Sequence, residues 1–118
     1  MIIDAGGEIW FAAIDGVVVG ACALLVVEPG MMEFSKLGVD KAARGKGVAR
    51  ALLRHCIARA KARGCHTLRI YTSSKLAPAN TLYQSEGFQY VEMSAEQRQY
   101  YARGDVMYDL PLTTAKSA

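Results

Sequence analysis

The residues best suited to chemistry form one short stretch, Arg44-Gly45-Lys46-Gly47-Val48-Ala49. It lies between an apolar, strand-like run at 34–39 and a long helical pattern at 48–63. Glycines let the backbone come close to a ligand, and the first N–H groups of a helix have no carbonyl partner inside it. Those N–H groups point outward at the positive end of the helix dipole. The stretch therefore predicts an anion-binding loop that fits a pyrophosphate.

The context of the two glycines decides what this pattern means. A Gly-x-Gly pair also serves ordinary tight turns, which is the alternative interpretation. Arg44 and Lys46 add positive charge beside the amides, and strand, loop, helix is the order that a phosphate loop requires. The sequence contains no Walker motif, and the third glycine of the dinucleotide fingerprint is absent after Val48. The loop thus indicates another kind of phosphate-bearing cofactor.

Length and composition restrict the class of protein. A chain of 118 residues with 52% apolar residues predicts one ordered domain over 1–118, with flexible ends at 1–7 and 113–118. No apolar run is long enough to span a membrane and the first residues do not resemble a signal peptide, so we expect a cytoplasmic protein. Cys22, Cys56 and Cys65 lie far apart in apolar or helical contexts. That spacing indicates buried thiols rather than a disulfide framework or a zinc site.

Positive charge is concentrated in one third of the chain. Ten of the fourteen Lys and Arg residues fall between Lys36 and Arg69, where Asp40 is the only acidic residue. This region favours an anionic ligand or forms a solvated helix face. A nucleic-acid interface is the competing interpretation. It is disfavoured because the basic residues are not interleaved with aromatic ones and match no known nucleic-acid-binding module.

Periodicity of the apolar residues predicts eight elements. In chain order they are strands at 8–14, 17–27 and 31–39, a helix at 48–63, a strand at 67–72, a helix at 76–86, and strands at 88–93 and 106–112. Asp15-Gly16 between the first two strands is a strong hairpin signal, and Gly64 stands where the long helix should end. The helical crossover makes the strand at 67–72 parallel to the strand at 31–39. The segment 94–104 is polar.

Three separated segments together resemble a known family. They are Glu33-Phe34-Ser35-Lys36-Leu37-Gly38-Val39, the loop at 44–49, and Ala79-Asn80-Thr81-Leu82-Tyr83 followed by Gly87-Phe88. In this order they resemble the GNAT-family N-acetyltransferases. The loop fits that family's Arg/Gln-x-x-Gly-x-Gly/Ala signature through Arg44, Gly47 and Ala49. The resemblance extends from Trp10 to Leu110.

The resemblance implies an α/β fold with a GNAT-like mixed, splayed β-sheet flanked by helices. Acetyl-CoA, the acetyl-donor cosubstrate, would lie in the split between the strands at 34–39 and 67–72. The loop amides would hold its pyrophosphate, and the strand before the loop would pair with its pantetheine arm. The implied cofactor-binding residues are Leu37, Gly38, Val39, Arg44, Gly45, Lys46, Gly47, Val48, Ala49 and Asn80.

Two residues are the candidates for proton transfer. Tyr83 follows Asn80 at the position where the family commonly carries a general-acid tyrosine, which would protonate the departing thiolate. Its alternative role is packing on the helix face with Leu82. Glu33 is the candidate general base because similar enzymes often place a glutamate there, and burial would raise its pKa toward a useful value. Its alternative role is a solvated strand end.

The acceptor side is expected just before the last strand. Tyr100, Tyr101, Arg103 and Asp105 occupy the segment that lines the acceptor pocket in related small acetyltransferases. Tyr101 and Arg103 are the substrate-binding candidates. Arg103 could grip a carboxylate with two hydrogen bonds, which would favour an amino acid or a related metabolite.

One departure from the family concerns the beginning of the chain. GNAT proteins usually start with a strand and two helices that help to wall the acceptor side, and here only a few residues precede the first strand. A naturally short chain, a fragment, and completion by a second subunit, such as a homodimer, remain open. The expected function is acetyl transfer from acetyl-CoA to a primary amine of a small molecule, without nucleic acid, metal or membrane. The alternatives are a non-catalytic CoA-binding module and a partial acetyltransferase.

Overall fold

The computed structural model describes residues 7–100 and 104–112, with the side chain of Tyr100 excluded. In this part of the chain the elements follow the order β1 (Glu8–Ile14), β2 (Val17–Glu28), β3 (Met31–Val39), the 3₁₀ turn η1 (Lys41–Ala43), α1 (Val48–Ala62), β4 (Thr67–Thr72), α2 (Ala77–Ser85), β5 (Gln89–Val91), α3 (Ala95–Tyr100) and β6 (Val106–Pro111).

The strands form one mixed sheet in the order β1-β2-β3-β4-β6-β5. Strands β1 to β3 are an antiparallel meander, as predicted. Asp15 and Gly16 both have positive φ at the first turn, which suits the right-handed twist of a two-residue hairpin. β4 is parallel to β3 and antiparallel to β6. The mixed sheet flanked by helices confirms the fold class inferred from the sequence.

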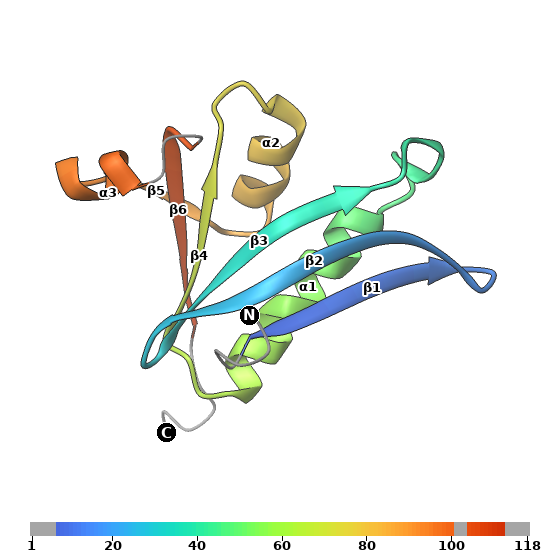
Figure 1. Ribbon diagram of the computed structural model, residues 1–118, viewed down its shortest axis with the longest axis horizontal. Helices are drawn as coiled ribbons and strands as arrows, with labels where there is room; N and C mark the ends of the chain where they lie inside the picture. The colour runs from blue at the N-terminus through green and yellow to red at the C-terminus, as the bar shows by residue number, and fades with distance from the viewer. Residues whose placement is uncertain (1–6, 101–103, 113–118) are drawn as a thin grey trace.

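The parallel strands β3 and β4 start together and then part. They pair only where Met31–Glu33 lies beside Thr67–Arg69, and beyond this point Figure 1 shows them diverging. A β-bulge lies just past the last pair. Two residues of β3, Lys36 and its neighbour, lie opposite one residue of β2, and Lys36 has a φ of 55°. A bulge bends and twists its strand, so it supports the separation of β3 from β4.

Helix α1 covers one face of the sheet because its apolar residues recur at helical spacing. Its buried residues are Val48, Leu52, Leu53, Cys56 and Ala60. The helix ends just before Gly64, which has positive φ and was predicted to terminate it. The Cys65 N–H donates to the Ala60 carbonyl and the Gly64 N–H to the Lys61 carbonyl, the double bond pattern of a glycine-ended helix.

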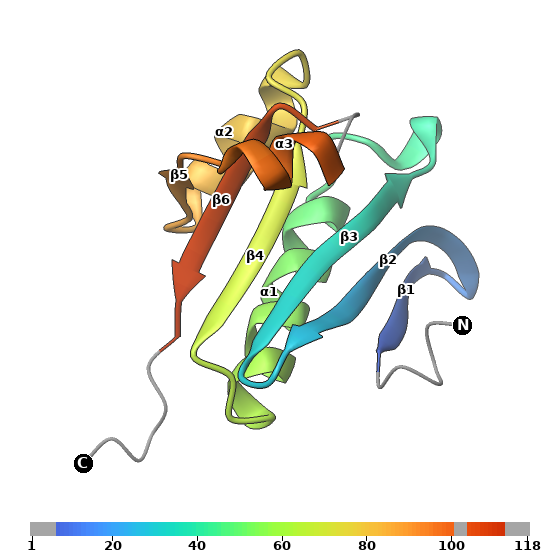
Figure 2. The same ribbon diagram turned by 60° about the vertical axis from the view of Figure 1, so that its left-hand side comes forward.

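The other two helices lie at the end of the sheet that contains β4, β5 and β6. α2 lies on the same side as α1, and Figure 2 shows α3 on the opposite side, in front of β4 and β6. All three cysteines are buried, as predicted, and the Cys22 and Cys56 sulfurs lie 3.6 Å apart between β2 and α1. None of the helices in the described residues is long and apolar enough to cross a membrane.

The sequence did not predict α3. Its signal is present, because Ser94 and Gln97 form a capping box. The Gln97 N–H donates to Ser94 Oγ over 3.1 Å and the Ser94 N–H donates to Gln97 Oε1 over 2.9 Å. The strand β5 is also shorter than the expected 88–93, since pairing with β6 is confined to Gln89–Val91.

Candidate active site

The separation of β3 and β4 leaves a cavity of about 690 Å³. Its walls come from β3, β4, α2 and the start of the segment before β6. The lining residues are Glu33, Phe34, Ser35, Lys36, Leu37, Ile70, Tyr71, Thr72, Ser73, Leu76, Ala79, Tyr83 and Gly104. Residues 34–39 of β3 pair with β2 on one edge only, so their other edge has no partner strand. An extended amide-containing molecule could pair with this edge.

The loop at the end of β3 has the geometry of an anion site. Gly45 and Gly47 both have a φ of +81°, and no atom lies within 4 Å of the place where a side chain would begin at either residue. The first main-chain bond of α1 runs from the Ala51 N–H to the Gly47 carbonyl. In the described part of the chain, the amide hydrogens from Gly45 to Ala49 have no protein acceptor. The loop therefore presents several free donors to solvent.

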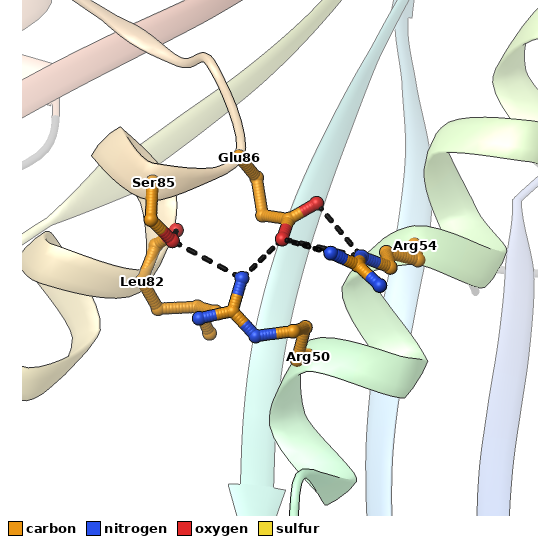
Figure 3. Close-up of polar contacts among 5 residues, drawn as sticks. All are labelled: Arg50, Arg54, Leu82, Ser85 and Glu86. Atoms are coloured by element: carbon orange, nitrogen blue, oxygen red, sulfur yellow. Dashed lines mark hydrogen bonds and ion pairs between the residues drawn. The ribbon is translucent and has the colours of Figure 1, made fainter.

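Two arginines of α1 are tied to the end of α2 (Figure 3). Arg54 contacts Glu86 through two nitrogens at 3.0 Å, and Arg50 pairs with the same carboxylate. Arg50 also donates to Ser85 Oγ, which in turn donates to the Leu82 carbonyl. The two guanidinium groups hold the pKa of Glu86 below its ordinary value. These contacts fix α2 against the helix that follows the loop.

Three further arginines of the basic stretch also have acidic partners. Arg59 and Arg63 bind Glu8 on β1 over 2.7 and 3.0 Å, and they lower the pKa of that carboxyl to about 2. Arg69 binds Asp109. Five of the ten basic residues between Lys36 and Arg69, on which the nucleic-acid interpretation rested, thus form ion pairs within the protein.

The remaining cations of the stretch lie mainly at the loop. Among the described residues, Lys36, Lys41, Lys46 and Lys61 have no ion pair, and Arg44 donates only to the Val39 carbonyl, over 3.2 Å. All of these except Lys61 lie between the bulge of β3 and the start of α1. Uncompensated positive charge therefore accompanies the free amides, as an anionic ligand requires.

Tyr83 lies in an aromatic cluster that borders the cavity. Its ring contacts Phe34, Phe88 and Tyr108 at centroid distances of 6.4, 6.2 and 6.2 Å, and only 5% of the residue is exposed. Burial raises the pKa of the phenol, so it stays protonated at neutral pH. The packing role and the proton-donor role considered for Tyr83 are compatible with one position.

Glu33 borders the same cavity from the other side, at the last pair of the β3–β4 ladder. Burial raises the pKa of its carboxyl, while the positive charges of Lys36 and Arg69 act in the opposite direction. A carboxylate with a raised pKa in a cavity is suited to accept a proton near neutral pH. The structure thus brings together the two residues that the sequence proposed for proton transfer.

Asn80 is engaged within the protein. Its Nδ2 donates to the carbonyls of Ser73 and Leu76 over 2.9 and 2.8 Å, and its Oδ1 accepts from the Tyr108 hydroxyl over 2.7 Å. The sequence assigned this residue a hydrogen bond to the cofactor. In the structure, its contacts connect the end of β4, the start of α2 and β6. No local sequence pattern predicts this network.

Of the residues expected on the acceptor side, Tyr101 and Arg103 lie outside the described residues. Asp105 is described, and it accepts hydrogen bonds from the N–H and Oγ of Ser74 over 2.7 and 2.6 Å. These bonds lower the pKa of Asp105 and fix the loop between β4 and α2. Within the described residues, no group of three His, Cys, Asp or Glu side chains could hold a metal ion.

Comparison with known proteins gives consistent matches. The sequence model of the family described as "Acetyltransferase (GNAT) domain" matches residues 5–90. Mycothiol acetyltransferase of Beutenbergia cavernae is 31% identical over 99 residues, which is 76% of this chain and 33% of that protein. Human N-acetylaspartate synthetase is 33% identical over 90 residues, 75% of this chain and 30% of that protein. The chain thus spans about a third of the length of these curated relatives.

Solved structures share the fold. A GNAT-family acetyltransferase from Staphylococcus aureus Mu50 superposes with a TM-score of 0.81 at 22% identity, covering 94% of this chain and 71% of that one. A GNAT-family acetyltransferase from Elizabethkingia anophelis, solved with acetyl-CoA bound, gives a TM-score of 0.78 at 19% identity, covering 94% and 79%.

Proposed function

The chain belongs to the acetyltransferase (GNAT) family, and from this premise we propose that it transfers an acetyl group from acetyl-CoA to a primary amine of a small molecule. The observation that carries the proposal is the cavity between β3 and β4, where Glu33 and Tyr83 border the same space. The proposed anion-binding loop follows the strand that forms one wall, after the 3₁₀ turn η1.

The donor fits the described residues. The free amides from Gly45 to Ala49 would bind the pyrophosphate, with Arg44 and Lys46 supplying positive charge. The unpaired edge of β3 at Leu37, Gly38 and Val39 would hydrogen-bond the amides of the pantetheine arm. The Elizabethkingia structure, solved with acetyl-CoA bound, supports this choice of donor. Asn80 is omitted from the proposed cofactor contacts because its amide is used within the protein.

The proposed proton transfers follow from the two pKa directions. Glu33 takes a proton from the acceptor ammonium, directly or through water, and the freed nitrogen forms a bond to the thioester carbonyl carbon. The carbon–sulfur bond breaks, and Tyr83 gives its phenolic proton to the departing sulfur. The second proton lost by the attacking nitrogen restores the phenol. The proton held by Glu33 passes to solvent, so each turnover releases one proton.

The acceptor is proposed as a small molecule because relatives are named for products or substrates of that kind, N-acetylaspartate and mycothiol. An acceptor carboxylate held by Arg103 beside Tyr101 is the finer proposal. An Arg103→Ala variant assayed against an amino-acid panel tests it, and equal rates in variant and wild type would exclude Arg103 from the acceptor site. The acceptor side could also be completed by a second subunit.

The overall function is tested by following release of the CoA thiol from acetyl-CoA in the presence of a panel of primary amines. Amine-dependent release, abolished in a Tyr83→Phe Glu33→Gln double variant, is the expected result. Binding of acetyl-CoA without amine-dependent release by any member of the panel would identify a CoA-binding module instead. Salt-sensitive nucleic-acid binding that CoA does not displace would instead support the nucleic-acid-binding interpretation.

A further inference from the structure

Arg69 and Asp109 form an ion pair with two hydrogen bonds on the sheet beside Glu33. Arg69 Nε and Nη2 donate to the two carboxylate oxygens of Asp109 over 2.7 and 2.8 Å. The two residues lie opposite each other on β4 and β6, and their side chains are only 14% and 19% exposed. Two parallel hydrogen bonds between partly buried, directly paired residues fix the position of the guanidinium group.

This guanidinium group lies beside Glu33. Glu33 and Arg69 are the last residues that pair between β3 and β4, so their side chains leave the same face of adjacent strands. The opposite face carries Met32 and Leu68, which are buried in the core. Arg69 also lines a second cavity of about 430 Å³ together with residues of α3. Figure 2 shows α3 in front of β4 and β6. Glu33 and Arg69 therefore meet where the two strands part.

Other charged or titratable groups lie around Glu33 and Arg69 in the described residues, and Glu28 and Glu96 line the second cavity together with Arg69. Lys36 comes from β3 itself, and it is exposed at the bulge. Tyr71 from β4 and Tyr83 from α2 line the same cavity, and β2 places Leu25 opposite Glu33. Burial raises the pKa of Glu33 while Lys36 and Arg69 oppose that rise. Of the two cations, solvent screens Lys36 more, because Lys36 is exposed whereas Arg69 is partly buried and held in place by Asp109.

We propose that Arg69, held by Asp109, is a positioning residue that keeps the Glu33 carboxylate charged beside the acceptor amine. This rests on the proposed function, in which Glu33 accepts the proton of the acceptor ammonium. Arg69 touches no reacting atom and transfers no proton. Arg69 determines the pH at which Glu33 loses its proton, and therefore the pH range in which the enzyme turns over.

The first test is the pH dependence of kcat/KM for the acceptor amine in wild type, Arg69→Met and Arg69→Lys. Loss of the cation should move the acid limb of the Arg69→Met profile upward by about one pH unit. Arg69→Lys keeps the charge and should return most of that shift. The matched control is Arg98→Met, which removes an arginine from a second ion pair, with Glu92, and should leave the limb unchanged. An Arg69→Met limb at the wild-type pH would overturn the proposal.

A second measurement tests the role of Arg69 even if a variant unfolds or the proposed function is wrong. Arg69→Gln retains a donor for Asp109 and replaces Arg69→Met if circular dichroism shows the latter unfolded. Titration of the Glu33 carboxyl by carbon-13 NMR in wild type and Arg69→Gln requires no turnover. A higher pKa of Glu33 in the variant supports the electrostatic role even if no amine is acetylated, an outcome that would refute only the proposed function. An unchanged Glu33 titration overturns the role of Arg69.

Discussion

Each of the two strands that part at the cavity is followed by a helix, and the N-termini of these two helices differ. α1 begins after Gly47, with no side-chain cap and with free amides in the loop before it. α2 also lacks a side-chain cap, but fewer of its donors are free: Pro78 has no N–H, and the Lys75 N–H donates to Ser73 Oγ. The Asn80 side chain also donates to the Ser73 and Leu76 carbonyls there. The N-terminus of α1 thus offers a longer run of free donors than the N-terminus of α2.

The two helix N-termini therefore suit different roles. Donors that lack a protein partner favour an anion, so the open N-terminus of α1 suits the diphosphate group of the donor. The start of α2 offers fewer free donors and is held by contacts within the protein. It instead fixes the helix that carries Tyr83, and Glu86 ties the other end of α2 to α1 (Figure 3). Four experiments test this contrast.

The largest effect is expected from Gly47→Val. A β-branched residue is strained at a φ of +81°, and its side chain would occupy the space in front of the amides. Loss of two charge-assisted hydrogen bonds should weaken acetyl-CoA binding about a thousandfold. Isothermal titration calorimetry measures this.

Gly64→Val is the matched control for that variant. Gly64 has a φ of +77° and similarly open surroundings at the other end of the same helix. It should show comparable strain with unchanged affinity. Equal affinity in Gly47→Val and wild type would remove the loop from the donor site.

Tyr83→Phe should act on turnover rather than on binding. The ring contacts with Phe34, Phe88 and Tyr108 are retained while the proton donor is lost. We expect kcat to fall about a hundredfold with the acetyl-CoA dissociation constant unchanged. Steady-state kinetics and calorimetry on the same preparation separate the two effects. A kcat within twofold of wild type would leave Tyr83 with packing alone.

Asn80→Ala should lower stability rather than affinity. The variant removes one of the two donors to each of the Ser73 and Leu76 carbonyls, and the acceptor of the Tyr108 hydroxyl proton. We expect a loss of about 1–2 kcal/mol in the free energy of unfolding. Urea unfolding gives this free energy, and the acetyl-CoA dissociation constant should change less than twofold. A tenfold weaker affinity with unchanged stability would restore the cofactor contact that the sequence suggested.

The smallest effect concerns the far end of α1, where Arg59 and Arg63 bind Glu8. The pKa of Glu8 is lowered from 4.5 to about 2, so the folded state binds fewer protons than the unfolded state in this range. Its stabilising contribution is present above pH 4.5 and is lost as the pH falls toward 2. Glu8→Gln should therefore melt below wild type at pH 7, and the gap should close on acidification. The exposed Glu92→Gln variant is the control.

Local sequence patterns predicted most of the secondary structure, because the meander, α1 and the loop before α1 depend on residues that are close in sequence. Asp15-Gly16 determines a hairpin and Gly64 determines a helix end whatever the rest of the chain does. The bulge at Lys36 could not be predicted, since a lysine gives no sign of a positive φ. It becomes visible only from the pairing of β3 with β2.

The candidate site was predicted unevenly for the same reason. Glu33 and Tyr83 were proposed from motifs, whereas the residues around them come from distant parts of the chain. Asn80 meets Tyr108 from β6, and Arg69 meets Asp109 forty positions later. Side chains brought together by sheet order leave no local signal, so the contacts of Asn80 and Arg69 required the three-dimensional structure.

The short ladder between β3 and β4 has a geometric consequence. Beyond Glu33, β3 continues for six residues, about 20 Å, and ends before the 3₁₀ turn that leads to the loop at 44–49. A turn of about 3° around the last paired residues would displace that far end by about 1 Å. The spacing between the loop and Tyr83 is therefore sensitive to the angle at which β3 and β4 part beyond their three residue pairs.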